Sequence, residues 1–153
     1  MVIQSPSRRN WLNRITGLAG ITLAWNGLPY RTAHAAASGA DREHFMARAY
    51  EMRRRAVASG DQAFGAVVVK DGRVVGEGVS AVLTTPDPTA HGEMQAIRDA
   101  ARRLGSQKLS GCELYTTYRP CTMCETAAYW AGIERIFYGE AINDGGAPRY
   151  RRC

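Results

Sequence analysis

The sequence lacks several features that would define other classes of protein. Residues 1–35 contain no aspartate or glutamate, and their longest apolar stretch, residues 15–28, is interrupted by threonine and asparagine. A membrane-spanning helix needs about 20 mostly apolar residues, so this stretch is too short and too polar. The chain of 153 residues has no internal repeat, which excludes solenoid folds, and its length suits one compact domain. Hydrophobic residues at 45% and charged residues at 22% argue against disorder along most of the chain.

The formal net charge of +6 arises mainly in the front segment. Of the 20 basic residues, four are arginines within residues 1–35, so 16 basic residues remain against 14 acidic ones. Beyond the front segment the chain is therefore nearly neutral. This balance disfavours an extended nucleic-acid-binding surface.

The front segment resembles a twin-arginine export signal. Arg8 and Arg9 precede the apolar stretch of residues 15–28, and the small-residue pattern Ala-His-Ala follows at residues 33–35. The alternatives are an amphipathic helix and a membrane anchor. We predict an export signal over residues 1–35, a mature domain over residues 36–153, no membrane span in the mature protein, and a periplasmic or secreted location.

Four cysteines in an oxidising compartment would usually suggest two disulfides. Cys121 and Cys124, however, lie at the predicted start of a helix, where they are better used as metal ligands. Cys112 opens an apolar run and is predicted to lie in the core. Cys153, the last residue, is predicted to be exposed.

Hydrophobic periodicity and turn residues predict alternating helices and strands. With Asp41 as its cap, the first helix buries Phe45, Ala49, Met52 and Ala56 on one face. The predicted elements are a helix over residues 45–56, strands over residues 64–70 and 73–78, a helix over residues 94–104 with Met94, Ile97, Ala101 and Leu104 as its apolar face, a strand over residues 114–117, a helix over residues 121–130 and a strand over residues 135–138. This order favours an α/β fold with helices packed on a mixed sheet.

Two aromatic residues on the last predicted helix, Tyr129 and Trp130, allow two interpretations. They fit either a dimer contact or the hydrophobic core. Because the helix follows the predicted metal ligands, we expect them in the core.

Two short motifs carry the chemistry: His91-Gly92-Glu93 and Pro120-Cys121-Thr122-Met123-Cys124. One imidazole and two thiolates bind zinc in catalytic sites that keep the fourth position for water, whereas a structural site supplies four protein ligands. Taken alone, Cys-x-x-Cys also fits a redox pair or half of a structural zinc site. Both motifs lie at helix starts, where the positive end of the helix dipole stabilises thiolate. We predict zinc on His91, Cys121 and Cys124, with Glu93 accepting a proton from the activated water.

Three segments carry a family resemblance: Thr89-Ala90-His91-Gly92-Glu93, Leu114-Tyr115-Thr116-Thr117, and the Pro120 motif. Together they resemble the cytidine and deoxycytidylate deaminase superfamily, in the branch of guanine deaminase, fungal cytosine deaminase and tRNA adenosine deaminase. The resemblance implies a three-layer sandwich, with a mixed five-stranded sheet and helices on both faces. It also implies hydrolytic deamination of a nucleobase or nucleoside, zinc on the His/Cys/Cys group, Glu93 as proton shuttle, Phe64 in the pocket wall and a homodimer.

The chain departs from these relatives at residues expected near the substrate. Ser80 stands where they place an asparagine that contacts the base, and a hydroxyl offers less than an amide's donor and acceptor pair. Ala63 replaces a proline, Arg119 precedes Pro120, and Tyr150-Arg151-Arg152 stands where guanine deaminases carry an acidic tail. The arginines there suit a phosphate or form a frayed basic tail.

Three functional hypotheses follow from these motifs and departures. The first is a zinc-dependent deaminase of a guanine- or cytosine-type base or nucleoside. The second is an enzyme like tRNA adenosine deaminase, which the nearly neutral charge and the export signal disfavour. The third is a zinc-stabilised binding module without activity, against which Glu93 argues.

Overall fold

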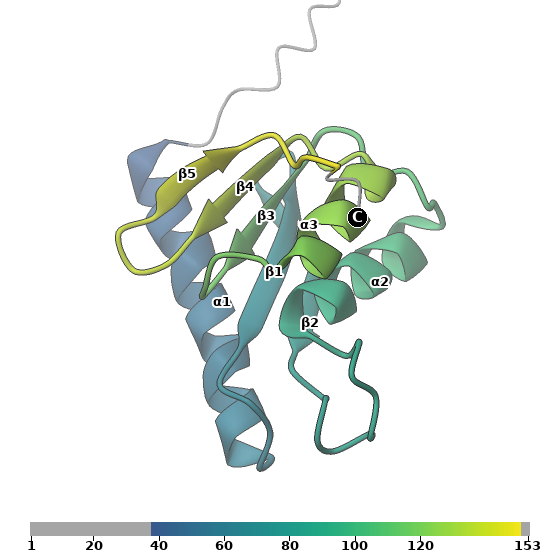
Figure 1. Cartoon of the computed structure of the whole chain (residues 1–153). Coiled ribbons are helices and arrows are strands. Elements are labelled where there is room, and N and C mark those ends of the chain that lie inside the picture. The colour runs from purple at the N-terminus through teal and green to yellow at the C-terminus, as the bar shows by residue number, and fades with distance from the viewer. Residues whose placement is uncertain (1–37, 151–153) are drawn as a thin grey trace, which may run out of the picture. The chain divides into compact units, whose positions relative to one another are not determined.

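The computed structural model describes residues 38–150, which form a mixed five-stranded sheet with helices on both faces (Figure 1). In chain order the elements are α1 (Gly39–Ala58), β1 (Gly65–Lys70), β2 (Arg73–Val79), α2 (Gly92–Leu104), β3 (Cys112–Thr116), α3 (Thr122–Ala131), β4 (Arg135–Tyr138) and β5 (Asn143–Gly146). The strand order is β2-β1-β3-β4-β5, with β3 and β4 parallel and the other neighbours antiparallel. The predicted α/β sandwich is confirmed.

Each face of the sheet has its own hydrophobic layer, because side chains alternate along a strand. In β1, Val67 and Val69 face α1, whereas Ala66 and Val68 face α2 and α3. The α1 layer consists of Phe45, Met46, Ala49, Met52, Val67, Val69, Tyr115 and Phe137. The opposite layer includes Ile97, Leu109, Cys112, Leu114 and Ile136. The predicted face of the first helix and the predicted core position of Cys112 are confirmed.

Glycines in β2 bring α2 unusually close to the sheet. A Cβ added to Gly76 would lie 2.5 Å from the carbonyl oxygen of Ala96, and one added to Gly78 would overlap with the carbonyl oxygen of Gly92. Gly92 in turn lies against Gly65 at the start of β1. The first turn of α2 is thereby fixed against β1 and β2, and the residues beside it gain a defined position.

This close approach changes which face of α2 is buried. Ile97 is buried as predicted, but its buried neighbours are the small Ala96 and Ala100. Leu104, which the periodicity places on the buried face, is 37% exposed. Met94 and Ala101 are only partly buried, so the predicted face is wrong except for Ile97, because the face that meets the glycines of β2 is the one that carries Ala96 and Ala100.

The helix termini follow ordinary capping rules with one correction. The cap of α1 is Ser38, whose hydroxyl accepts from the Asp41 backbone N–H at 3.2 Å, while the Asp41 carboxylate accepts from the Ser38 N–H at 3.1 Å. Asp41 is therefore the third residue of the helix and completes a capping box, rather than being the cap itself. Gly105 ends α2 in the left-handed conformation, with φ of 60°.

The prediction that Tyr129 and Trp130 lie in the core is wrong. Their side chains are 46% and 70% exposed, because α3 buries Cys124, Ala128 and Ala131 on its other side. The exposed rings contact each other, with centroids 5.6 Å apart.

One strand, β5, has no counterpart among the strands predicted from local sequence patterns. It pairs with β4, and Asp144 accepts from the Arg135 guanidinium at 2.6 Å across the pair. Its presence completes the five-stranded sheet that the family resemblance implies.

Some predictions concern residues that the structure does not describe. The proposed export signal of residues 1–35, the last two arginines and Cys153 lie outside residues 38–150. Among the described residues, none of the helices combines the length and the hydropathy needed to cross a membrane.

Candidate metal centre

The structure brings the ligand atoms of His91, Cys121 and Cys124 together although they come from two helices. His91 is the N-cap residue of α2, Cys121 is the N-cap residue of α3, and Cys124 lies in the first turn of α3. The Nδ1 atom of His91 is 3.6 Å from the Cys124 sulfur and 3.8 Å from the Cys121 sulfur, and the two sulfurs are 3.6 Å apart. Within residues 38–150 no other group of three such side chains meets the geometric requirements of a metal site.

These separations fit a single tetrahedral zinc ion. With Zn–S bonds of about 2.3 Å and Zn–N bonds of about 2.0 Å, two sulfurs are separated by about 3.8 Å and a sulfur and a nitrogen by about 3.5 Å. The observed distances lie within a few tenths of an ångström of these values. The three side chains can therefore bind zinc with little movement, and one coordination position remains for a further ligand.

The electrostatic surroundings of Cys124 also call for a cation. Burial raises the pKa of this thiol, and the nearby Glu93 and Cys121 raise it further. A thiolate at this position therefore needs a positive charge beside it. Bound zinc would supply that charge, in addition to the exposed N–H groups at the start of α3.

Glu93 lies beside the ligand group without belonging to it. Only 5% of the residue is exposed, and its carboxylate is near enough to Cys124 to raise the pKa of that thiol. The oxygen atoms of Glu93 are not part of the cluster that His91 and the two cysteines form. A buried carboxylate that faces a metal site without filling it is suited to proton transfer.

The two residues predicted to bind substrate lie at the same end of the sheet. Phe64 immediately precedes β1 and packs edge-on against Tyr118, with ring centroids 5.4 Å apart. Ser80 immediately follows β2, and its backbone N–H donates to the Phe64 carbonyl at 3.2 Å. The Ser80 side chain is 1% exposed, and its hydroxyl donates to Asp61 at 2.8 Å.

Asp61 is a residue that the sequence patterns did not single out. Its side chain is 8% exposed and accepts hydrogen bonds from the loop after β2. An aspartate in a Ser-Gly-Asp turn is ordinarily a local turn residue. No sequence signal connects Asp61 with Ser80, which is 19 residues away.

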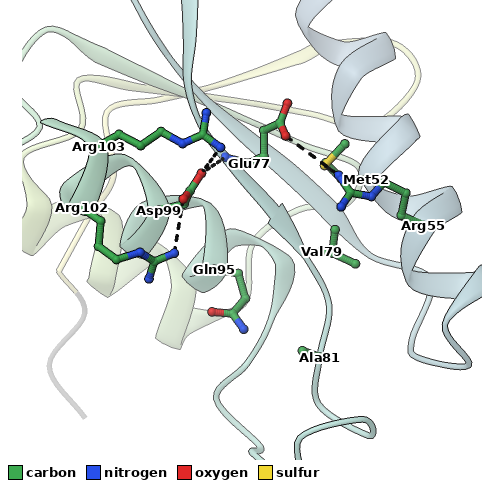
Figure 2. A pocket seen from close by; sticks show the side chains of 9 residues that line it. All are labelled: Met52, Arg55, Glu77, Val79, Ala81, Gln95, Asp99, Arg102 and Arg103. Carbon is green, nitrogen blue, oxygen red and sulfur yellow. Dashed lines mark hydrogen bonds and ion pairs between the residues drawn. The ribbon is translucent and has the colours of Figure 1, made fainter.

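A separate hollow of about 380 Å³ lies between α1, the outer edge of β2 and α2 (Figure 2). Asp99 lines it from α2 and pairs with Arg102 at 3.3 Å and with Arg103 at 2.8 Å. Asp99 also accepts from the backbone N–H of Glu77 at 3.0 Å. None of the predicted metal ligands lines this hollow, and its charged groups are engaged with one another.

Comparison with known proteins agrees with this geometry. Residues 40–140 match the model of the cytidine and deoxycytidylate deaminase zinc-binding region. The chain is 45% identical to guanine deaminase of Bacillus subtilis over 67% of its own length and 66% of that protein. It is 40% identical to the tRNA-specific adenosine deaminase of Aquifex aeolicus, over 63% of this chain and 64% of that protein. The chain thus matches just under two thirds of the length of these relatives.

Solved structures show the same fold. The structure of Bacillus subtilis guanine deaminase superposes with a TM-score of 0.61 at 46% identity, covering 63% of this chain and 62% of that one. A crystal structure in complex with 2,6-diaminopurine superposes with the same TM-score at 29% identity, covering 63% of this chain and 55% of that one. The His/Cys/Cys group described above is typical of the zinc sites of these proteins.

Proposed function

Because the chain belongs to the family that carries the cytidine and deoxycytidylate deaminase zinc-binding region, we propose that it removes the exocyclic amine of a nucleobase or nucleoside by hydrolysis. The observation that carries the proposal is the buried carboxylate of Glu93 beside three side chains spaced for one tetrahedral zinc ion. A zinc site that only stabilises a fold closes all four positions with protein ligands. Here three ligands and an adjacent acid favour catalysis.

In this mechanism His91, Cys121 and Cys124 hold the metal, and Glu93 moves the protons. Zinc bound in such a site would lower the pKa of a water molecule to about 7. The Glu93 carboxylate accepts a proton from the attacking water and donates it to the ring nitrogen of the base. The carboxylate then takes the remaining proton of that water from the hydroxyl now on the ring carbon and delivers it to the departing amine, so that ammonia leaves and a carbonyl remains. Burial of Glu93 keeps bulk water from competing for these protons.

The substrate we propose is a small free base or nucleoside of the guanine or cytosine type. Two findings support a purine: the identity to a guanine deaminase and the fold shared with a protein that binds 2,6-diaminopurine. Phe64 supplies an apolar ring for the wall of the pocket. Aromatic side chains suit this role because the flat face of a base stacks on them.

A tRNA adenosine deaminase is the second candidate, favoured by the 40% identity to such an enzyme. The charge balance beyond residue 35 argues against it, since a surface that binds folded RNA carries a marked excess of basic residues. A zinc-stabilised module without activity is a third candidate, and it offers no role for Glu93.

Two further proposals concern assembly and location. We propose a homodimer, and the exposed Tyr129 and Trp130 suit a contact between subunits. We also propose export of the folded protein on the basis of Arg8 and Arg9. Sedimentation would test the dimer. Cell fractionation of the protein and of a variant with lysine at both arginines would test export, with retention of the variant as the expected result.

The proposed activity is tested by incubating zinc-loaded protein with guanine, cytosine, adenine, their nucleosides and a tRNA anticodon stem-loop. Ammonia release from a free base or nucleoside supports the first proposal. Release from the stem-loop alone would favour the second candidate. A zinc-binding protein that releases no ammonia from any of them would identify a binding module.

A further inference from the structure

The most heavily hydrogen-bonded carboxylate among the described residues is that of Asp61. It accepts six hydrogen bonds from the protein, and only 8% of the residue is exposed to solvent. Three consecutive backbone N–H groups after β2 donate to it: Val82 at 3.1 Å, Leu83 at 2.8 Å and Thr84 at 2.8 Å. The N–H of Gln62, the next residue in the chain, donates at 2.8 Å. Two hydroxyls also donate, Ser80 Oγ at 2.8 Å and Thr84 Oγ1 at 3.0 Å.

These bonds join two loops at the end of the sheet where the metal centre lies. Asp61 belongs to the 59–64 loop, which ends in Phe64 directly before β1. Five of the six hydrogen bonds come from the 80–91 loop, which begins with Ser80 and ends with His91, and the sixth comes from Gln62 in the same loop as Asp61. The far end of the 80–91 loop is closed separately, since Ala81 N–H donates to the Ala90 carbonyl at 2.9 Å. Asp61 therefore holds the first half of the loop, while α2 holds His91.

The hydrogen bonds outweigh the effect of burial on Asp61. Burial by itself raises the pKa of this carboxyl, but the bonds from Thr84, Ser80, Gln62 and Leu83 together hold the pKa well below its ordinary value. The carboxylate thus remains ionised at any working pH, and all its hydrogen-bond acceptors stay available to the two loops.

Ser80 is part of the same arrangement. A hydroxyl has one proton to donate, and Ser80 donates it to Asp61. With 1% of the residue exposed, Ser80 is turned into the junction between the loops. In this orientation the Ser80 hydroxyl serves the junction between the loops, because its one proton is already donated to Asp61.

We propose that Asp61 is a positioning residue for substrate binding: by joining the 59–64 loop to the 80–91 loop, its carboxylate holds Phe64 and Ser80 in place as the wall of the site. This inference rests on the proposed function. Asp61 touches neither the reacting atoms nor the metal, so its removal should weaken substrate binding while leaving the chemical step and the metal in place.

The first experiment replaces Asp61 with asparagine. The substitution Asp61→Asn preserves size but turns a donor amide toward backbone N–H groups, which breaks the junction. We expect KM for the substrate to rise about tenfold and kcat to stay within about twofold. Zinc content should remain that of the wild type. The matched control is Asp99→Asn, which also removes a carboxylate bonded to a backbone N–H, but in the hollow away from the site.

A milder variant covers the case in which Asp61→Asn fails to fold. Thr84 is exposed, and Thr84→Val removes one hydroxyl donor while keeping its backbone N–H bond to Asp61. We expect a smaller rise in KM, about twofold to threefold, again without loss of kcat. An unchanged KM in both variants, or a fall in kcat with KM unchanged, would overturn the proposal.

A double-mutant cycle determines whether Ser80 acts through Asp61. If Ser80 serves the junction, Ser80→Ala and Asp61→Asn together raise KM little more than Asp61→Asn alone. If the increase in KM of the double variant equals the product of the increases in the two single variants, Ser80 contacts the substrate independently. The role assigned to the Ser80–Asp61 pair is then wrong.

Two readouts that need no turnover separate this inference from the proposed function. Amide hydrogen exchange at residues 82–84 should accelerate about tenfold in Asp61→Asn and remain unchanged in Asp99→Asn. Calorimetry with 2,6-diaminopurine should show weaker binding to Asp61→Asn. A wild type that binds this base but releases no ammonia would refute the deaminase while keeping the inference. A wild type with neither property would refute both.

Discussion

The start of α1 and the starts of α2 and α3 handle the same physical problem in opposite ways. The first N–H groups of any helix lack partners within the helix. In α1, Ser38 and Asp41 satisfy two such groups with their side chains. In α2 and α3 the N-cap positions are occupied by His91 and Cys121, and neither side chain makes a capping hydrogen bond.

The difference shows that the starts of α2 and α3 are less stable locally because their N-cap positions carry metal ligands instead of capping residues. A serine or aspartate at an N-cap stabilises a helix by about 1 kcal/mol. At α2 and α3 that stabilisation is replaced by residues that can bind a metal, and the uncapped N–H groups leave a positive field there. Sites of function often break a local rule in this way. The comparison can be tested by changing one helix start at a time.

The largest expected effect concerns Glu93, in the first turn of α2. Glu93→Gln keeps the shape of the side chain but removes its basicity, so kcat should fall about 1,000-fold. Zinc content should not change, because Glu93 lies outside the ligand cluster. Glu125→Gln in the first turn of α3 is the control and should retain activity. Near-normal turnover of Glu93→Gln would refute the assigned role.

The second-largest expected effect is the loss of zinc binding when a metal ligand at the start of α3 is removed. We expect Cys124→Ser to weaken zinc binding more than about 100-fold, because loss of a ligand exceeds the usual effect of altering a ligand's partners. Its melting temperature should then stop responding to a chelator. Cys112→Ala removes an equally buried thiol outside the site and should keep zinc at a cost of about 1 kcal/mol. Loss of zinc in both variants would contradict the assignment.

Replacing His91 with an ordinary N-cap residue should stabilise the metal-free fold and remove a metal ligand. His91 has the extended backbone of an N-cap residue, with φ of −62° and ψ of 152°, so serine fits there. In the presence of a chelator, His91→Ser should stabilise the fold by about 1 kcal/mol relative to the wild type. Zinc should no longer stabilise the variant. Chemical denaturation with and without zinc measures both effects, and a less stable metal-free variant would contradict the comparison.

Removing the cap of α1 should change stability without touching the site. Ser38→Ala should destabilise the protein by about 1 kcal/mol, whereas Ser38→Gly should have an effect of only a few tenths. Thermal unfolding would resolve the difference, which corresponds to roughly 4 °C. Turnover of both variants at 25 °C should equal that of the wild type. Reduced turnover in Ser38→Ala would link α1 to the site after all.

The smallest expected effect is the response of the α1 cap to pH. Hydrogen bonds from Ser38 lower the pKa of Asp41 below its ordinary value of 3.8. A carboxyl with a lowered folded pKa stabilises the fold fully above its unfolded pKa and loses that contribution as pH falls through the folded value. The stability difference between the wild type and Asp41→Asn should thus stay constant above about pH 5 and shrink as the pH falls further through the folded pKa, which lies below 3.8. A difference that grows on acidification would exclude the capping role.

Local patterns were sufficient to predict the elements that bury regular faces. The face of α1 was predicted from the spacing of Phe45, Ala49, Met52 and Ala56, and all four are buried. The sheet's last strand could not be found in this way. Residues 143–146 read Asn-Asp-Gly-Gly, a composition typical of turns, and they form a strand because β4 offers an unpaired edge. Their strand conformation is therefore a tertiary effect.

The residues near the metal centre show the same limit. The spacing of Cys121 and Cys124 and the order of the two motifs were enough to predict the group that the structure brings together. The junction at Asp61 was not predictable, since it depends on two loops meeting in space. Trp130 was misplaced because hydrophobicity alone does not say which side of a short helix faces the sheet.

The carboxylate of Asp99 affects how readily the edge strand β2 can pair with a strand of another molecule. β2 is an outermost strand, and its Glu77 N–H points away from the rest of the sheet toward Asp99. Exposed donors of this kind invite strands from neighbouring molecules to add on, which is a route to fibrils. By accepting from that donor, Asp99 leaves one N–H fewer on this edge for a strand of a neighbouring molecule to pair with.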